Sequence, residues 1–114
     1  MKSMQQLFLP AMLALLCAFA NPAQAGAESP DAVVIIKGMK FQPQEITVHK
    51  GAVVRWENRE KRQYHSVWFE QAGDPEPDYF FPGEYYERKF DKVGVFPYRC
   101  GPHPEMTGVV KVVE

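Results

Sequence analysis

Three side chains with metal-binding chemistry lie close together near the C-terminal end of the chain. They are the thiol of Cys100, the imidazole of His103 and the thioether of Met106, with two residues between neighbours and a proline on each side of the histidine. Thiolate and thioether sulfur are soft donors, and together with imidazole they suit copper in both of its common oxidation states. The spacing therefore predicts a short, stiff loop between two strands that contributes three ligands to a copper ion.

A second imidazole would complete the trigonal set of two histidines and one cysteine, with a weak axial methionine, that is typical of blue-copper sites. The chain has three histidines, so the choice lies between His49 and His65. His49 stands in a predicted turn beside Lys50-Gly51, where a solvated side chain is expected. His65 begins an apolar segment and is expected at one end of the fold. The predicted ligands are His65, Cys100, His103 and Met106.

The N-terminal residues have the three parts of a secretory signal peptide. Lys2 gives a positive start, Leu7–Ala20 is an almost unbroken apolar run, and Ala23-Gln24-Ala25 is a small-x-small cleavage site. The apolar run is shorter than the roughly 20 residues that a membrane-spanning helix needs. We therefore predict a signal peptide at 1–25 and an exported domain at 26–114, with no membrane anchor after cleavage; a retained anchor is the alternative.

Export makes the cysteine count informative. Cleavage removes Cys17, so Cys100 becomes the only cysteine and cannot form an internal disulfide. A lone thiol in an oxidising compartment is reactive, paired between molecules or bound to a metal. Two alternatives to copper remain open from the residues: a structural role without any metal, and a zinc site, although zinc rarely takes methionine.

Short strands are the elements expected to position these residues. Apolar runs, many of them rich in β-branched residues and separated by turn residues, occur at 32–36, 46–48, 53–56, 66–69, 85–90, 95–99 and 109–113. No sustained helical periodicity is visible after the signal peptide, and the 10 prolines of the chain disfavour helices. The pattern predicts an all-β domain, an antiparallel β-sandwich of about seven strands.

Two connections have a distinct composition. The residues His49-Lys50-Gly51 predict a hairpin turn between the strands at 46–48 and 53–56. The stretch 70–83 is acidic and ends in the aromatic triplet Tyr79-Phe80-Phe81, so we expect a loop whose aromatic end packs on the sandwich. The domain as a whole is slightly acidic and offers no electrostatic footprint for nucleic acid.

Two segments of the chain carry a family pattern. They include Met39-Lys40-Phe41, Pro43, Ile46-Thr47-Val48, Gly51, Val54, Trp56, Asn58 and His65-Ser66-Val67, and then Tyr98, Cys100, Pro102-His103-Pro104, Met106 and Gly108. These segments resemble the plastocyanin/azurin family of cupredoxins, most closely its amicyanin and pseudoazurin branch. The resemblance implies a Greek-key, cupredoxin-like sandwich of seven or eight strands. It also implies a periplasmic protein that carries single electrons by outer-sphere transfer, with one type 1 (blue) copper per chain.

The resemblance also implies a role for each site residue. The strong ligand plane would be formed by His65, Cys100 and His103. Met106 would supply a long axial bond, and Asn58 would link the two ligand loops by hydrogen bonds. The electron-transfer surface would consist of Pro102, His103 and Pro104. The expected partners are redox proteins such as a c-type cytochrome or a periplasmic dehydrogenase or oxidase, and the protein is expected to be a monomer.

Departures from the branch limit what the resemblance implies. Glu105 replaces an apolar residue and puts a charge near the expected docking surface, and 70–83 does not match amicyanins, so a methylamine-pathway role is not implied. The alternative function is a periplasmic copper-binding protein for copper tolerance or delivery, although the exported domain lacks the Met or His clusters such proteins often carry. A multicopper oxidase needs more histidines than the three present, so no enzyme activity is expected.

Overall fold

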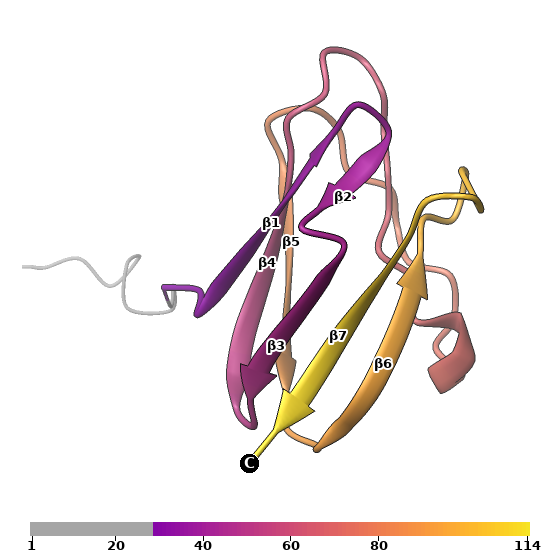
Figure 1. Ribbon diagram of the computed structural model, residues 1–114. Helices are drawn as coiled ribbons and strands as arrows, with labels where there is room; N and C mark the ends of the chain where they lie inside the picture. Colours follow the sequence, from indigo (N-terminus) through magenta and orange to yellow (C-terminus); the bar gives the residue numbers. More distant parts are fainter. Residues whose placement is uncertain (1–28) are drawn as a thin grey trace, which may run out of the picture.

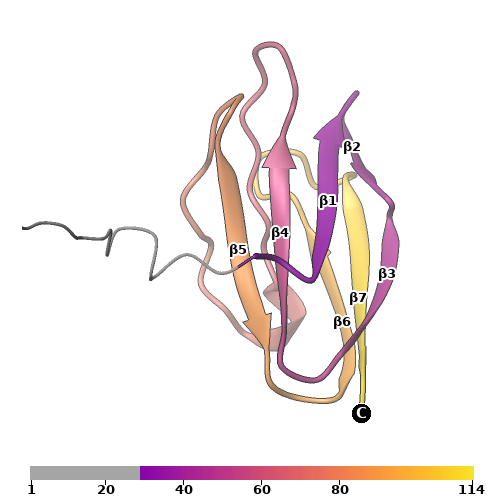
Figure 2. The same cartoon turned by 90° about the vertical axis from the view of Figure 1, so that its left-hand side faces the viewer.

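Two β-sheets pack face to face to form a sandwich (Figure 1, Figure 2). The computed structural model describes residues 29–114, and the predicted signal peptide lies outside them. One sheet has the strand order β2-β1-β4-β5 and the other β3-β7-β6. The strands are β1 (Ala32–Lys37), β2 (Lys40–Gln42), β3 (Glu45–His49), β4 (Ala52–Asn58), β5 (Tyr85–Phe90), β6 (Gly94–Arg99) and β7 (Thr107–Val113). The predicted all-β sandwich is confirmed.

The chain changes sheet three times, between β2 and β3, between β3 and β4, and between β5 and β6. The predicted hairpin at His49-Lys50-Gly51 is therefore wrong, because β3 pairs with β7 and β4 pairs with β1 and β5. The turn instead crosses from one sheet to the other, and the Gly51 N–H donates to the Phe90 carbonyl at the end of β5. Crossing in this way also makes two pairs of neighbours, β1 with β4 and β3 with β7, run parallel.

The segment Ser66–Phe69 does not form the strand that its apolar residues predict. Just before this segment, the backbone of His65 pairs with that of Phe80. Within it, the backbone of Trp68 pairs with that of Arg99. Because the partner changes within a few residues, no continuous ladder forms, and a short 3₁₀ turn, η1 (Glu70–Ala72), follows at once. Within residues 29–114, no helix is long and apolar enough to cross a membrane.

Side-chain alternation along the strands builds the core between the sheets. In β1, Val34 and Ile36 are fully buried while Val33 points to solvent, as the two-residue period of a strand requires. Trp56 of β4 is fully buried at the centre of an aromatic cluster, with ring centroids 6.1 Å from Phe69 and 5.4 Å from Tyr98. This packed centre is the rigid body on which the loops at one end are mounted.

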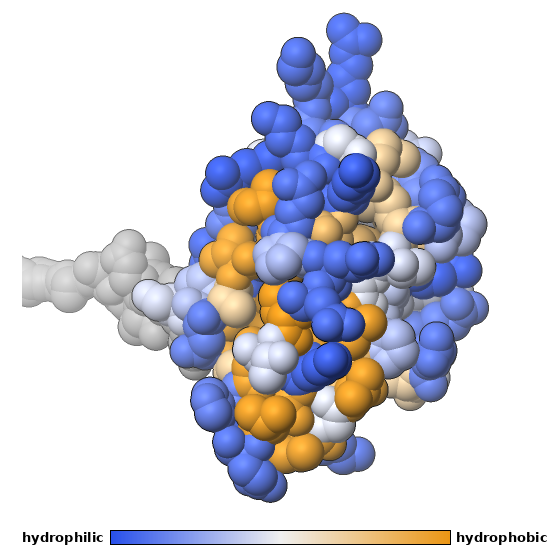
Figure 3. All heavy atoms as spheres, viewed as in Figure 1, coloured by the Kyte–Doolittle hydropathy of each residue, from blue (hydrophilic) through white to orange (hydrophobic). Residues whose placement is uncertain are grey.

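The two ends of the sandwich differ. The loop between β6 and β7 lies toward the upper end in Figure 1, where the loop that follows β4 also lies, and the C-terminus lies at the lower end. Apolar side chains gather on the lower part of the face seen in Figure 3, where β6 begins and β7 ends, and Val95 and Val113 are exposed there. His49 ends β3 opposite Val113, so it lies at the lower end.

Candidate metal centre

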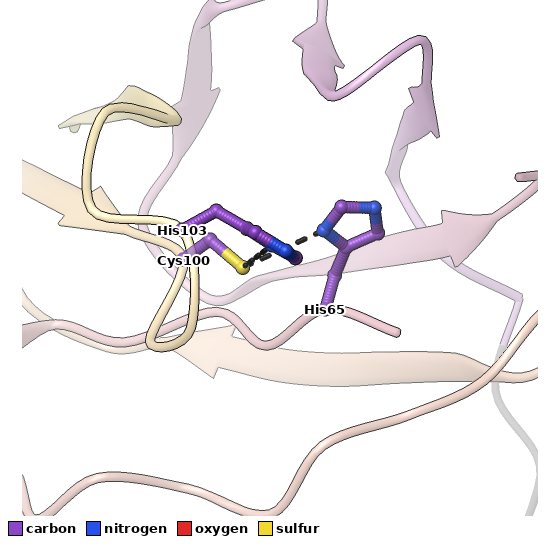
Figure 4. Close-up of side chains that lie close together, drawn as sticks. All are labelled: His65, Cys100 and His103. Carbon is purple, nitrogen blue, oxygen red and sulfur yellow. Dashed lines mark hydrogen bonds between the residues drawn. The ribbon is translucent and has the colours of Figure 1, made fainter. Parts of the chain in front are cut away.

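Three of the predicted ligands meet toward the upper end of the sandwich. The Sγ atom of Cys100 lies 3.5 Å from Nδ1 of His65 and 3.5 Å from Nδ1 of His103. All three donor atoms lie within 4.8 Å of one another, and Figure 4 shows the side chains directed toward a common point. Two imidazole nitrogens and one sulfur at these separations fit the coordination of a single metal ion.

The fourth predicted ligand, Met106, ends the loop that Cys100 begins. The Cys100 N–H donates to the Met106 carbonyl over 2.9 Å, and the Met106 N–H donates to the His103 carbonyl over 2.9 Å. These bonds tie the two ends of the loop together and set the place of the histidine between them. Met106 is only 3% exposed, so its thioether lies in the interior. That position suits the predicted role of a soft ligand for a buried metal ion.

The backbone of His65 is held by a pair of hydrogen bonds to Phe80. Its N–H donates to the Phe80 carbonyl over 3.1 Å, and the Phe80 N–H donates back to the His65 carbonyl over 2.8 Å. Three residues later, Trp68 makes the corresponding pair of bonds with Arg99, the residue before Cys100. The imidazole and the thiol are therefore positioned by two separate backbone bridges, although 35 residues separate them in the chain.

Ser66 joins the two ligand segments directly. Its backbone N–H donates to the Cys100 sulfur over 3.4 Å, and its Oγ accepts the Gly101 N–H over 2.8 Å. A side chain at position 101 would collide with Ser66 Oγ and with the carboxylate of Glu76, so glycine fits there without displacing either side chain. Sequence reasoning missed this role, since the only signal was a serine next to a predicted ligand.

Asn58 does not make the link between the ligand loops that the resemblance implied. Its side-chain amide donates to the carbonyls of Gln63 and Phe80, and its Oδ1 accepts the N–H of Glu60. Gln63 and Glu60 belong to the segment before His65, and Phe80 is the residue whose backbone pairs with His65. The physical reason is position: Asn58 ends β4 and closes the loop that follows it, whereas Ser66 faces the cysteine.

Burial sets the charge state of both buried donors. Burial lowers the pKa of His65 below its usual value, although hydrogen bonding to Glu60 acts in the opposite sense, so the ring is neutral at neutral pH. Burial likewise raises the pKa of the Cys100 thiol, against the effect of the Ser66 N–H. A metal cation binds the neutral imidazole and replaces the thiol proton. The donor set, one soft thiolate and two imidazoles with a buried thioether beside them, fits copper.

His103 differs from His65 in being partly exposed. Its ring lies 6.2 Å from that of Tyr64, which stacks on Tyr79 at 5.1 Å and meets the edge of Phe81 at 5.7 Å. All three aromatic rings are exposed, with relative exposures between 41% and 52%. The aromatic end of the 70–83 loop is thus divided: Phe80 packs on the sandwich as expected, while its two neighbours surround Tyr64 beside the site.

The other residues considered from the sequence are placed clearly. His49 is exposed, its Nδ1 lies 2.8 Å from the Glu114 carbonyl, and it is absent from the described group of possible metal ligands. Met39, expected in the core, is half-buried and packs against the core. Glu105 is exposed on the ligand loop. Glu60, which sequence reasoning did not single out, contacts His65 directly.

Comparison with known proteins gives a consistent picture. The family model described as copper binding proteins, plastocyanin/azurin family, matches residues 31–113. Amicyanin-alpha of Methylorubrum extorquens is 35% identical over 90% of this chain and 96% of its own length. Amicyanin of Paracoccus denitrificans is 34% identical over 83% of this chain and 82% of its own length.

A solved structure shares the fold. The crystal structure of amicyanin from Paracoccus versutus superposes with a TM-score of 0.69 at 32% identity, and the match covers 77% of this chain and 86% of that one.

Proposed function

Because the chain belongs to the plastocyanin/azurin family of copper-binding proteins, we propose that it carries single electrons between redox proteins. Its cofactor is copper. A bound copper ion supplies a one-electron couple, Cu(II)/Cu(I), that neither the imidazoles nor the thiol can provide. The residues proposed to hold it are His65, Cys100, His103 and Met106.

The observation that carries this proposal is the rigid, dry setting of two of the donors, His65 and Cys100. His65 and Cys100 are fully buried, and each is fixed by backbone hydrogen bonds to a different part of the sandwich. Side chains held in this way cannot rearrange freely when the charge at the site changes by one. A small rearrangement keeps the barrier to electron transfer low, and the burial of His65 and Cys100 reduces the contribution of solvent reorganisation.

His103 is the proposed route for electrons. It is the one nitrogen donor of the described site that reaches the surface, and Pro102 and Pro104 flank it on the loop. Pro104 is exposed and Pro102 half-buried, and we take these two neighbours of His103 in the chain as the apolar rim of the site. A partner that docks on this rim brings its own redox centre close to the imidazole edge, and transfer needs no bond to form or break.

The finer parts of the function follow from the same proposal. We infer that the protein works in the periplasm after removal of 1–25, that its partners are a c-type cytochrome or a periplasmic dehydrogenase or oxidase, and that it transforms no substrate. The signal-peptide pattern and the lone thiol of the exported domain support the location. Membership of the plastocyanin/azurin family of copper-binding proteins supports a carrier rather than an oxidase.

The experiment that tests this function mixes the reduced copper protein with c-type cytochromes and dehydrogenases purified from the same source. Fast, bimolecular exchange that saturates with partner concentration is expected, and the zinc-loaded protein is the matched control that cannot exchange. Absence of exchange with every periplasmic redox protein, together with copper sensitivity in a strain that lacks the gene, would instead assign the protein to copper tolerance.

A further inference from the structure

Glu60 connects the buried histidine of the site to a strained turn. Its carboxylate Oε2 lies 2.8 Å from Nε2 of His65, on the opposite side of the ring from the Cys100 sulfur. The Glu60 side chain is only 9% exposed. A carboxylate that is nearly removed from water and touches a neutral imidazole needs further donors to satisfy its oxygens.

Those donors come from the turn between β1 and β2. The Gly38 N–H donates to Oε1 of Glu60 over 3.0 Å, and the Met39 N–H donates to Oε2 over 2.8 Å. Both residues have positive φ, 63° and 60°, and Met39 is the only non-glycine residue in the described chain with this conformation. Positive φ at both central residues is the geometry of a tight hairpin turn, and here it directs both N–H groups at one carboxylate.

The contacts determine which nitrogen of His65 carries the proton. Both oxygens of the Glu60 carboxylate accept backbone N–H groups, Oε1 from Gly38 and Oε2 from Met39, as an ionised carboxylate does. An ionised carboxylate only accepts, so the neutral imidazole must present N–H to it at Nε2. The Nδ1 lone pair then faces the Cys100 sulfur and the metal position.

We propose that Glu60 is a positioning residue of the copper site, which fixes the tautomer and orientation of His65 and lowers the reduction potential by favouring Cu(II). A carboxylate that accepts the distal proton of a ligand histidine makes the ring a stronger donor. A stronger donor and a nearby negative charge stabilise Cu(II) more than Cu(I), because Cu(II) carries the higher charge. This proposal rests on the proposed copper site, and it adds a residue whose backbone anchor lies in the β1–β2 turn.

The first test needs no variant and no metal. Long-range proton–nitrogen correlation spectra of the ¹⁵N-labelled, metal-free protein at neutral pH report which ring nitrogen of each histidine is protonated. We expect His65 to carry its proton on Nε2, with slow exchange because the hydrogen bond is buried, whereas exposed His49 exchanges quickly. A His65 ring protonated on Nδ1, or one that averages between tautomers, would overturn the proposal.

The second test compares reduction potentials of the copper protein and two matched variants, each losing one carboxylate charge. Glu60→Gln removes the charge next to His65, while Glu57→Gln removes one that pairs with Arg55 and Arg59. We expect Glu60→Gln to change the Cu(II)/Cu(I) ratio at fixed potential by at least tenfold toward Cu(I), which is a rise of about 59 mV for a one-electron couple. Glu57→Gln should change it much less.

The outcomes separate cleanly. Equal shifts in both variants, or none in Glu60→Gln, would contradict a specific role for Glu60. If Glu60→Gln does not fold, as judged by circular dichroism, the tautomer measurement on the unmodified protein decides. If that protein shows the expected tautomer but yields no blue-copper spectrum, the proposed function fails and the positioning of His65 by Glu60 stands.

Discussion

The two histidines of the site are distinguished by burial. The His65 ring is inaccessible to solvent, while the His103 ring reaches the surface between two prolines. Removal of the His103 ring should therefore leave a gap that water can reach, whereas removal of the His65 ring should leave a gap closed off from water. This difference gives a test of the ligand assignment that does not depend on loss of binding alone.

We predict that His103→Gly loses the wild-type visible spectrum and regains most of it when imidazole is added, because the vacated position opens to solvent. His65→Gly should not be restored at the same imidazole concentration, since that position lies behind a packed surface. His49→Ala, the control, should keep the wild-type spectrum because His49 lies at the other end of the sandwich. A changed spectrum in His49→Ala would show that the wrong upstream histidine was assigned.

Glu105 places a charge on the ligand loop, next to Met106. Replacing it by phenylalanine should raise the reduction potential, because a negative charge favours Cu(II). The side chain is exposed, so water and salt screen it, and the rise should stay below about 59 mV, the tenfold value for a one-electron couple. Voltammetry at low and high salt checks this: the difference between the two proteins should shrink as salt is added. A difference that is independent of salt would contradict the exposed placement.

Residue types and spacing were enough to predict which side chains meet, but not what holds them. The set of cysteine, histidine and methionine is local in the sequence, so its chemistry could be interpreted directly. Ser66 holds Gly101, 35 residues away in the chain, and the carboxylate of Glu60 is held by Gly38, 22 residues away. Neither Ser66 nor Glu60 has a local pattern that marks it. The role expected of Asn58 was wrong because a family pattern identifies a residue without identifying its hydrogen-bond partners.

Strand β7 depends on a glycine for its fit to β6. Gly108 lies opposite Tyr98 in the register, and a side chain there would collide with the tyrosine ring. That ring is buried and packs edge-on against Phe41, with centroids 4.8 Å apart. The glycine thus allows an aromatic side chain to lie across the neighbouring strand, beneath the loop that bears the ligands.

We predict that Gly108→Ala lowers the free energy of unfolding by about 1–3 kcal/mol, the usual cost of overpacking a close-packed interior. Urea unfolding of the metal-free protein measures this without a contribution from copper. Thr107→Ala, at an exposed neighbouring position of the same strand, should cost much less. Equal losses in the two variants would mean that the tyrosine ring moves aside without cost.

Strands were easier to predict than their partners. Apolar and β-branched runs indicate extended segments from local properties, and most of the expected strands exist. Pairing is not local: β1 lies beside β4 and β3 beside β7, so a turn sequence such as His49-Lys50-Gly51 cannot show whether the chain folds back or crosses to the other sheet. Ser66–Phe69 has strand composition, but its two bridges face different partners.

At the scale of the whole molecule, the site ties together segments that the fold brings to one end. His65 follows the first sheet's β4, and Cys100 follows the second sheet's β6. An ion bound to both would therefore cross-link the two halves of the sandwich. A small domain has a limited core, so such a cross-link should contribute noticeably to its stability.

We predict that removal of copper lowers the melting temperature by more than about 10 °C. Binding to the folded state alone contributes about 4 kcal/mol when the free metal exceeds Kd a thousandfold, and about 1 kcal/mol moves Tm of a small domain by 4–8 °C. Calorimetry of the copper-loaded and chelator-treated protein measures the difference, and copper added back should restore it. An unchanged Tm would mean that the metal does not bridge the two segments.

The most direct test of the copper site is the visible spectrum of the Cu(II) protein beside that of Cys100→Ser. Bonding of a cysteine thiolate to Cu(II) gives an intense blue or green charge-transfer band, and serine oxygen cannot replace it. We expect the unmodified protein to show this band at one copper per chain, and the variant to lack it while remaining folded. An intense band that survives Cys100→Ser, or a folded wild-type protein that binds copper without colour, would contradict the assignment of this site.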